Sequence, residues 1–212
     1  MIVVSLVASP HSRPGPHDHW FGGARWSIFA PAGSRPAPIE LATIDLADPL
    51  LDLGPRKGLV PLCTRPDGMS LLPQSYSYDE IGHTVAFDGP PWSVEVDPAD
   101  EIGMPLPACA MRLRRPQGAE DNDTADRWDA QDTFLGGSAF FRVGGAPIWL
   151  NGPETARCSC GRPCTFVAGV GYEHYDTTTG MLAGKPFFIG EMALYFLACF
   201  KCHRVVVLSQ ST

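Results

Sequence analysis

Glycine and proline occur throughout this chain at a density that excludes long helices. The 212 residues include 22 glycines and 21 prolines, about one residue in five, where average usage gives roughly 12%. Proline removes a backbone donor, and glycine weakens the interior of a helix. Short apolar or alternating runs lie between these breakers, which is the pattern of short strands joined by turns. We therefore expect a mainly β fold with a minor helical part.

Apolar, aromatic or alternating runs mark the expected strands. The predicted strands cover residues 1–8, 39–46, 59–63, 75–79, 83–87, 92–96, 165–170, 187–189, 192–199 and 204–208. Those at 75–79 and 83–87 should pair around a short turn. Polar and charged residues dominate 97–133, which is expected to be a surface excursion with at most one short helix. The chain then divides into an N-terminal β-rich unit (1–96), this excursion, and a C-terminal β-rich unit (134–212).

The two β-rich units echo one another in sequence. Residues 21–26 (FGGARW) resemble residues 143–149 (VGGAPIW), and each stretch is followed by a proline-containing loop and two apolar strands. Such an echo predicts duplicated units whose strands share one core.

The strongest chemical signal lies in the cysteines of the C-terminal unit. Cys158 and Cys160 form one close pair, and Cys199 and Cys202 form another. Two such pairs on separate turns can place four thiolates around one Zn(II) ion, and Gly161 allows the first turn to close. Four thiolates leave no open position for water. We therefore predict Cys158, Cys160, Cys199 and Cys202 as ligands of a structural zinc ion in a zinc-ribbon-like clip.

Other ligand sets and another metal also fit this spacing. Cys164 could replace Cys158, and His203 could be the fourth ligand. Iron also accepts four thiolates. The alternative without a metal is that these cysteines are small buried apolar residues. Cys63 and Cys109 stand alone in the sequence and are expected to fill the core.

Charge and hydropathy limit the partners and the compartment. The formal net charge is −7, and a chain without a basic face is not expected to bind nucleic acid. No run of about 18 apolar residues is present, so no membrane span is expected. The apolar start of the chain lacks a basic segment before it and is interpreted as a strand rather than a signal peptide. Clustered cysteines without an export signal favour a cytoplasmic protein with reduced thiols.

The remaining candidates for chemistry are polar residues of loops. His11, His17 and His19 lie near Asp18 and could hold a metal or act as a base, although a solvated loop is the simpler interpretation. Asp45 and Asp48 could form a carboxylate pair or start a turn. The remaining group is a basic cluster with acidic residues that are expected to neutralise it: Arg112, Arg114 and Arg115 with Glu120, Asp121, Asp123 and Asp126. No phosphate-binding loop or nucleophile elbow occurs, so we assign no catalytic residue.

These segments resemble the YwqG-like family, a bacterial domain of unknown function. The resemblance rests on FGGARWS (21–27), PIELATIDL (38–46), GLVPL (58–62), GGAPIWLNGPE (144–154), the Cys-Gly turn (160–161), TFVAGV (165–170) and IGEMALYFLACFKC (189–202). It covers residues 20–70 and 134–208, with departures at Thr43, Asn151 and Glu191. It implies a duplicated β-rich fold and no established catalysis. Some relatives lie near bacterial toxin genes, which points to immunity or partner binding.

Together these observations predict a non-enzymatic zinc-containing binding protein. Its expected role is to bind a protein partner as an immunity or accessory factor. One alternative is a metal-dependent hydrolase that uses the histidines of the N-terminal loop. Another is a carrier that holds a small ligand between the sheets.

Overall fold

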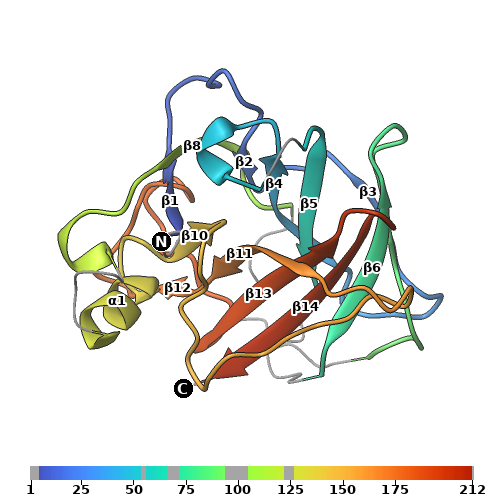
Figure 1. Cartoon of the computed structure of the whole chain (residues 1–212). Helices are drawn as coiled ribbons and strands as arrows, with labels where there is room; N and C mark the ends of the chain where they lie inside the picture. Colours follow the sequence, from blue (N-terminus) through green and yellow to red (C-terminus); the bar gives the residue numbers. More distant parts are fainter. Residues whose placement is uncertain (1–4, 54–55, 66–71, 94–104, 122–126, 212) are drawn as a thin grey trace.

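A single 12-stranded, curled sheet organises the chain in a computed structural model that describes residues 5–53, 56–65, 72–93, 105–121 and 127–211 (Figure 1). The strand order is β3-β7-β6-β14-β13-β11-β10-β1-β8-β2-β4-β5, and β12 and β9 form a separate pair. The predicted mainly β class is confirmed. Within the described residues, no helix has the length and apolar character needed to cross a membrane.

The elements are short, as the spacing of glycine and proline predicts. The strands are β1 (Leu6–Pro10), β2 (Trp20–Phe21), β3 (Ser27–Phe29), β4 (Ile39–Asp45), β5 (Leu59–Thr64), β6 (Gln74–Asp79), β7 (Thr84–Phe87), β8 (Cys109–Arg114), β9 (Leu135–Gly136), β10 (Phe141–Val143), β11 (Thr165–Val170), β12 (Tyr172–Glu173), β13 (Met192–Cys199) and β14 (Arg204–Ser211). The helical elements are η1 (Pro49–Leu51), η3 (Gly118–Glu120) and α1 (Arg127–Phe134).

Most predicted strands form where the sequence places them. β4, β5, β11, β13 and β14 match the predicted runs, and β6 and β7 form the expected antiparallel pair. The predicted first strand is represented by β1, and residues 1–4 lie outside the described residues. Residues 187–189 were wrongly predicted as a strand. Phe187 instead donates its N–H to Glu173 Oε2 (3.0 Å), and its carbonyl accepts the Glu173 N–H (2.8 Å). Of the predicted strand 92–96, residues 94–96 also lie outside the described residues.

The predicted surface excursion contains a strand of the main sheet. β8 lies between β1 and β2, so residues 109–114 are not a surface excursion. The prediction failed here because two arginines alternate with buried Met111 and Leu113, which gives a charged run that still has one apolar face. The single short helix expected in this segment is α1. The unit boundaries at 96 and 133 stay a prediction.

The repeated sequence pattern of the two halves is accompanied by a repeated local backbone geometry. Gly22 and Gly144 have nearly the same positive φ (63° and 64°). The Gly22 N–H donates to the carbonyl of Leu41 in β4, and the Gly144 N–H donates to that of Val167 in β11, both at 2.7 Å. Leu41 and Val167 each lie at a break in strand register, a bulge that turns a backbone carbonyl out of the ladder. The same local construction therefore occurs twice, as the duplicated-unit prediction requires.

The two halves exchange their first strands. β2, β4 and β5 follow one another in space, as β10, β11 and β13 do. The strand beside β2 is β8, however, and the strand beside β10 is β1. β1 and β8 then pair with each other, so each half contributes one strand to the sheet of the other. This exchange joins the halves into one continuous sheet.

The curled sheet returns on itself at a seam between β5 and β6 that side chains hold. The N–H groups of Leu59, Cys63 and Arg65 donate to the side chains of Glu80, Tyr76 and Gln74, at 2.9, 2.9 and 2.8 Å. These residues alternate along β5, and the remaining position of the alternation is Pro61, which has no backbone N–H to donate. Its carbonyl accepts the hydroxyl of Tyr76 (2.7 Å). The donors along this edge of β5 are thus satisfied without a backbone ladder.

Two apolar clusters fill the opposite faces of β13. Leu194 and Phe196 belong to the larger cluster, and Tyr195 and Leu197 belong to a smaller one. The smaller cluster is covered by α1 and by residues 148–164, which we call the covering segment. Burial on both faces explains why the sequence of β13 is apolar throughout instead of alternating.

We expect Tyr76→Phe to weaken the seam. The substitution removes the acceptor of the Cys63 N–H and the donor to the Pro61 carbonyl, both fully buried. An unsatisfied buried donor costs about 1–3 kcal/mol, and the free energy of unfolding measured by urea denaturation should fall by that amount. Tyr78→Phe is the matched control on the same strand, since the Tyr78 hydroxyl forms no hydrogen bond within the described residues. It should change stability by about 0.5 kcal/mol or less. Equal losses in the two variants would contradict this role for Tyr76.

Candidate metal centre

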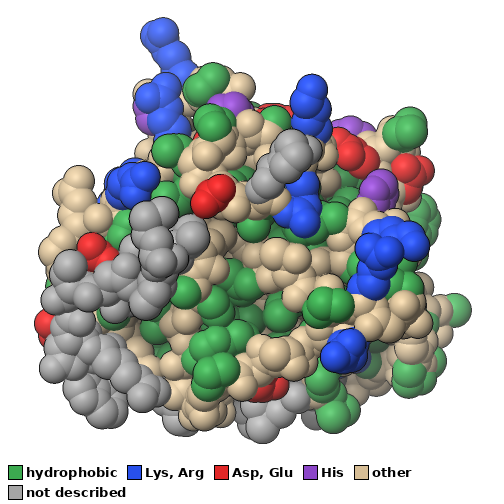
Figure 2. Space-filling model, viewed as in Figure 1, with side chains coloured by type: hydrophobic (Ala, Val, Ile, Leu, Met, Phe, Trp, Pro, Cys, Tyr) green, Lys and Arg blue, Asp and Glu red, His purple; other side chains and the backbone are tan. Residues whose placement is uncertain are grey.

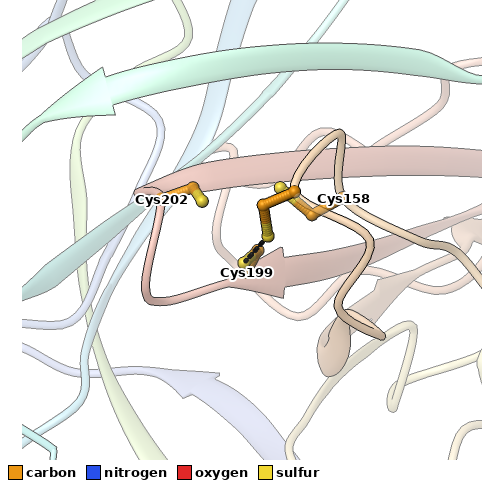
Figure 3. A group of neighbouring side chains, drawn as sticks. Cys158, Cys199 and Cys202 are labelled. Atoms are coloured by element: carbon orange, nitrogen blue, oxygen red, sulfur yellow. Dashed lines mark hydrogen bonds between the residues drawn. The ribbon is translucent and has the colours of Figure 1, made fainter.

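Four cysteine sulfurs from two turns converge at one end of β13. The Sγ atoms of Cys158, Cys160, Cys199 and Cys202 all lie within 4.8 Å of one another. The separation between those of Cys160 and Cys199 is 3.8 Å. Four sulfurs bound tetrahedrally at about 2.3 Å from a zinc ion stand about 3.8 Å apart. Figure 3 shows the side chains directed toward a common point. The cluster could therefore hold a metal ion.

The first turn is a tight hairpin at the end of the covering segment. The Cys164 N–H donates to the Ala156 carbonyl (2.9 Å), and the Cys158 N–H donates to that of Arg162 (2.9 Å). The Gly161 N–H then donates to the Cys158 carbonyl (2.8 Å), and Gly161 has φ 81°. This left-handed conformation favours glycine. The hairpin reverses within three residues and brings Cys160 back toward Cys158, which explains how the unusually close Cys-x-Cys spacing can serve one site.

The second turn connects β13 to β14. Cys199 is the last residue of β13 and pairs with Arg204 at the start of β14. The Cys202 N–H donates to the Cys199 carbonyl (3.1 Å), which folds the turn back over the strand end. Long ladders hold both flanking strands, so this pair of sulfurs is presented from a rigid support.

Electrostatics favour an anionic sulfur in this cluster. Cys158 and Cys199 are buried, whereas Cys160 and Cys202 are exposed. A hydrogen bond from the backbone of Cys160, together with bonds from the neighbouring thiols, lowers the pKa of Cys158 to about 6. The complementary hydrogen bonds with Cys160 and Cys158 raise the pKa of Cys202 to about 12. At neutral pH the metal-free cluster therefore carries a thiolate at Cys158, and a thiolate is the form that binds a metal ion.

The alternative ligands have other environments. Cys164 packs against the smaller apolar cluster, and burial raises the pKa of its thiol to about 11. The ring of His203 stacks on that of Tyr78, with centroids 5.3 Å apart and planes at 14°. Neither belongs to the group of converging ligand atoms. Cys63 is fully buried, as expected for core filler, whereas Cys109 is only partly buried. The choice of Cys158, Cys160, Cys199 and Cys202 as ligands, and of zinc over iron, stays a prediction.

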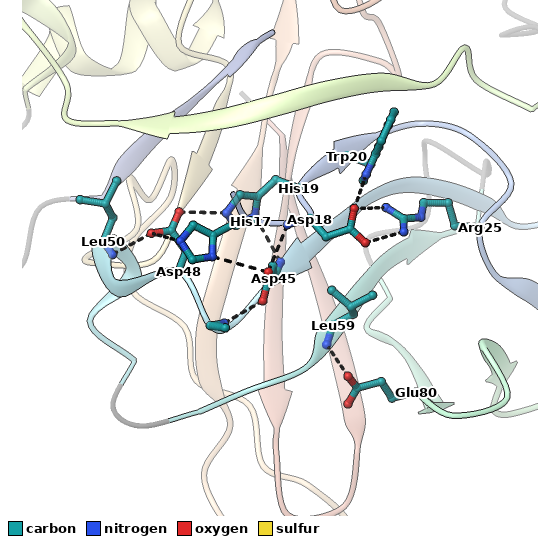
Figure 4. Close-up of polar contacts among 11 residues, drawn as sticks. His17, Asp18, His19, Trp20, Arg25, Asp45, Asp48, Leu50, Leu59 and Glu80 are labelled. Carbon is teal, nitrogen blue, oxygen red and sulfur yellow. Dashed lines mark hydrogen bonds and ion pairs between the residues drawn. The ribbon is translucent and has the colours of Figure 1, made fainter. Parts of the chain in front are cut away.

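His19 of the N-terminal loop forms hydrogen bonds with two aspartates, and His17 lies beside them (Figure 4). The Asp45 N–H donates to His19 Nδ1 (3.2 Å), so the ring proton lies on Nε2 and is donated to Asp48 Oδ2 (3.0 Å). His17 lies beside the same aspartates, 3.6 Å from Asp45 Oδ2. Asp48 also caps η1 by accepting the Leu50 N–H. Both ring nitrogens of His19 are thus used to hold the loop.

Other polar residues of interest are also paired. Asp18 binds the guanidinium of Arg25, and His11 contacts the nearby carbonyl of Arg13. Arg114 forms a bidentate ion pair with Glu120, which confirms the predicted neutralisation at that position. Asp123 and Asp126, two further acidic residues of this prediction, lie outside the described residues. Among the described residues, the four cysteines are the only group of three or more ligating side chains that could hold a metal ion.

Gln210 in β14 is a site residue that sequence reasoning missed. Its Oε1 accepts the N–H groups of Leu150 and Asn151 (2.9 and 3.1 Å), and its Nε2 donates to the Gly152 carbonyl (3.0 Å). It thereby fixes the start of the covering segment, whose end carries Cys158 and Cys160. A single glutamine in a strand gives no sequence signal for such a role.

Comparisons with known proteins leave the family open. No protein-family model matches the chain, and neither the curated proteins nor the solved structures contain a significant match. The resemblance to YwqG-like proteins stays a prediction.

We expect the purified protein to contain about one tightly bound zinc ion per chain. Replacing Cys199 and Cys202 together with serine should abolish metal binding and lower the melting temperature, because binding energy of a structural metal contributes to folding. Metal content is measured by inductively coupled plasma mass spectrometry. The control is Cys164→Ser, which should keep the metal. Metal that persists in the double variant, or that is lost from the Cys164→Ser variant, would contradict the proposed ligands.

We also expect His19 to make stability depend on pH. Burial lowers the pKa of His19 below its ordinary value of 6.5. The unfolded chain therefore binds a proton that the folded chain does not, and stability falls as the pH drops below about 6.5. In His19→Asn this component is absent, and the slope of unfolding free energy against pH should decrease. An unchanged slope in His19→Asn would show that His19 does not contribute.

Proposed function

We propose that this chain is a non-enzymatic, zinc-containing binding protein whose metal ion is structural. The observation that carries the proposal is the convergence of four sulfurs within 4.8 Å. A tetrahedral shell of four thiolates is closed, so no position remains for a water molecule or a substrate. Catalytic zinc sites keep such a position open. The chemistry of the ligand set therefore supports a role in folding.

The position of the cluster supports the same role. The covering segment is held at its start by Gln210 and by Tyr195, whose hydroxyl donates to the Ile148 carbonyl (2.8 Å). Shortly before the segment enters β11 at Thr165, its hairpin meets the turn from β13 to β14 at the cysteine cluster. A metal ion there would close the second attachment and keep the apolar outer face of β13 covered. Zinc(II) would thus act as a clip between the covering segment and the turn from β13 to β14.

The proposed role is binding to a protein partner, as an immunity or accessory factor of a cytoplasmic system. Three features support it. Within the described residues, both ring nitrogens of His19 are hydrogen-bonded, His17 lies 3.6 Å from Asp45 Oδ2, and His11 contacts the Arg13 carbonyl. The proposed metal shell offers no reaction site. The resemblance to YwqG-like proteins points to partner binding rather than catalysis.

Removal of the metal should release the covering segment before the sheet. We expect hydrogen–deuterium exchange in residues 148–164 to accelerate by about tenfold or more after chelation, because local opening exposes its backbone. Exchange in β1 and β8 should stay unchanged, since backbone ladders on both sides hold these strands. Mass spectrometry of peptides from the chelated and zinc-reloaded protein measures both.

Two results would contradict a metal clip that holds the covering segment alone. Unchanged exchange in the covering segment would show that the metal does not hold it. Loss of protection in all strands at once would show that the metal stabilises the whole fold instead of one attachment.

A further inference from the structure

A hollow of about 160 Å³ opens beside the cysteine cluster, at the end of the β5–β6 seam. Three parts of the chain meet there: the connection from β4 to β5, the strand β6 with its following turn, and the turn from β13 to β14. The lining side chains are Leu46, Arg56, Lys57, Leu59, Tyr78, Glu80, Phe200 and His203. Pockets for whole small molecules take about 300–1,000 Å³, so this hollow suits a group the size of a side chain.

The hollow carries more positive than negative charge in a chain whose net charge is −7. On the face of the molecule shown in Figure 2, basic and acidic side chains are scattered among apolar and polar ones. Arg56 and Lys57 line the hollow, and neither forms an ion pair with a carboxylate in the described part of the chain. Glu80 is the one acidic residue in the lining. Its Oε1 accepts the Leu59 N–H at 2.9 Å, which fixes this carboxylate against the seam. Two cations therefore face one carboxylate that already has a structural partner.

Aromatic contacts hold Arg56 and His203 in place. The Arg56 guanidinium lies over the ring of Phe200, 4.4 Å from its centre. His203 stacks on Tyr78, and its carbonyl accepts the Tyr78 N–H at 2.9 Å. Stacking of this kind leaves the edge of a guanidinium free to donate hydrogen bonds. Phe200 and His203 belong to the turn that carries Cys199 and Cys202, so the metal clip and this hollow share a wall.

We propose that this hollow binds a carboxylate group, supplied by an acidic side chain of a protein partner. The inference rests on the proposed role in protein binding and adds the chemistry of one contact. Arginine and lysine donate charge-assisted hydrogen bonds to carboxylates, and arginine can do so through two parallel bonds. A single negative charge balances the excess of one cation over Glu80. A phosphate dianion would bring a second negative charge close to that fixed carboxylate.

A pair of peptides tests the proposal. Both are capped at each end and fluorescently labelled. One alternates glycine with glutamate, and the other carries glutamine in place of each glutamate. We expect the glutamate peptide to bind about tenfold or more tightly by fluorescence anisotropy, and its affinity to fall as salt is added. Equal affinity of the two peptides, or binding of inorganic phosphate without binding of the glutamate peptide, would overturn the proposal.

Two double variants that each remove two positive charges distinguish binding at this site from general electrostatic attraction between the protein and the peptide. Arg56→Gln with Lys57→Gln should weaken the glutamate peptide about tenfold or more. Lys57→Gln alone, at an exposed position, should weaken it by a smaller factor. Arg13→Gln with Lys185→Gln removes the same charge from exposed positions elsewhere and should leave affinity unchanged. Equal losses in the two double variants would overturn the site.

Metal content is measured in the same samples, so that the two proposals fail separately. Peptide binding that depends on Arg56 and Lys57 in a protein without zinc would support this site and reject the structural metal. One zinc per chain without selective peptide binding would support the structural metal and overturn the carboxylate site. Loss of zinc from the Arg56, Lys57 double variant with unchanged peptide affinity would show that these cations serve the thiolate cluster, and would overturn the proposal.

Discussion

Burial of β13 on both faces is the constraint on which the rest of the structure depends. One face packs into the larger apolar cluster, and the other would meet water if no further chain covered it. The covering segment runs into β11 at Thr165, and before that point side chains hold it on the sheet. Gln210 serves one end, and the cysteine cluster serves the other. The candidate metal centre thus lies where it can help to keep the outer face of β13 covered.

The parts of this fold that could be predicted are those whose sequence has a long, unambiguous pattern. β11 and β13 are continuous apolar runs, and the two cysteine pairs need only their spacing to suggest a shared ion. β2 and β10 have two and three residues, too few to show any period. β8 alternates in sequence, but its arginines made it look like surface. In each missed case, position within the sheet decided the structure and local composition did not.

The histidine loop shows why residue type alone is a poor guide to chemistry. His17 and His19 beside two aspartates have the composition of a metal or acid–base site. In the structure a backbone N–H occupies one nitrogen of His19 and a carboxylate accepts from the other. The seam between β5 and β6 is the converse case, because Gln74, Tyr76 and Glu80 carry no motif yet accept from the backbone donors along this edge of β5. The same property hides the hollow beside it, whose lining residues come from parts of the chain far apart in sequence.

The exchange of β1 and β8 has a consequence for how such a molecule could have arisen. If β1 is assigned to the first half and β8 to the second, the arrangement is that of two copies that exchange their first strands, as in a domain-swapped dimer. A linker would then join the two copies into one chain. Neither half contains every strand of its own part of the sheet, so each is completed by a strand of the other. After such a fusion the two copies are free to diverge, and the cysteine cluster lies in the C-terminal half alone among the described residues.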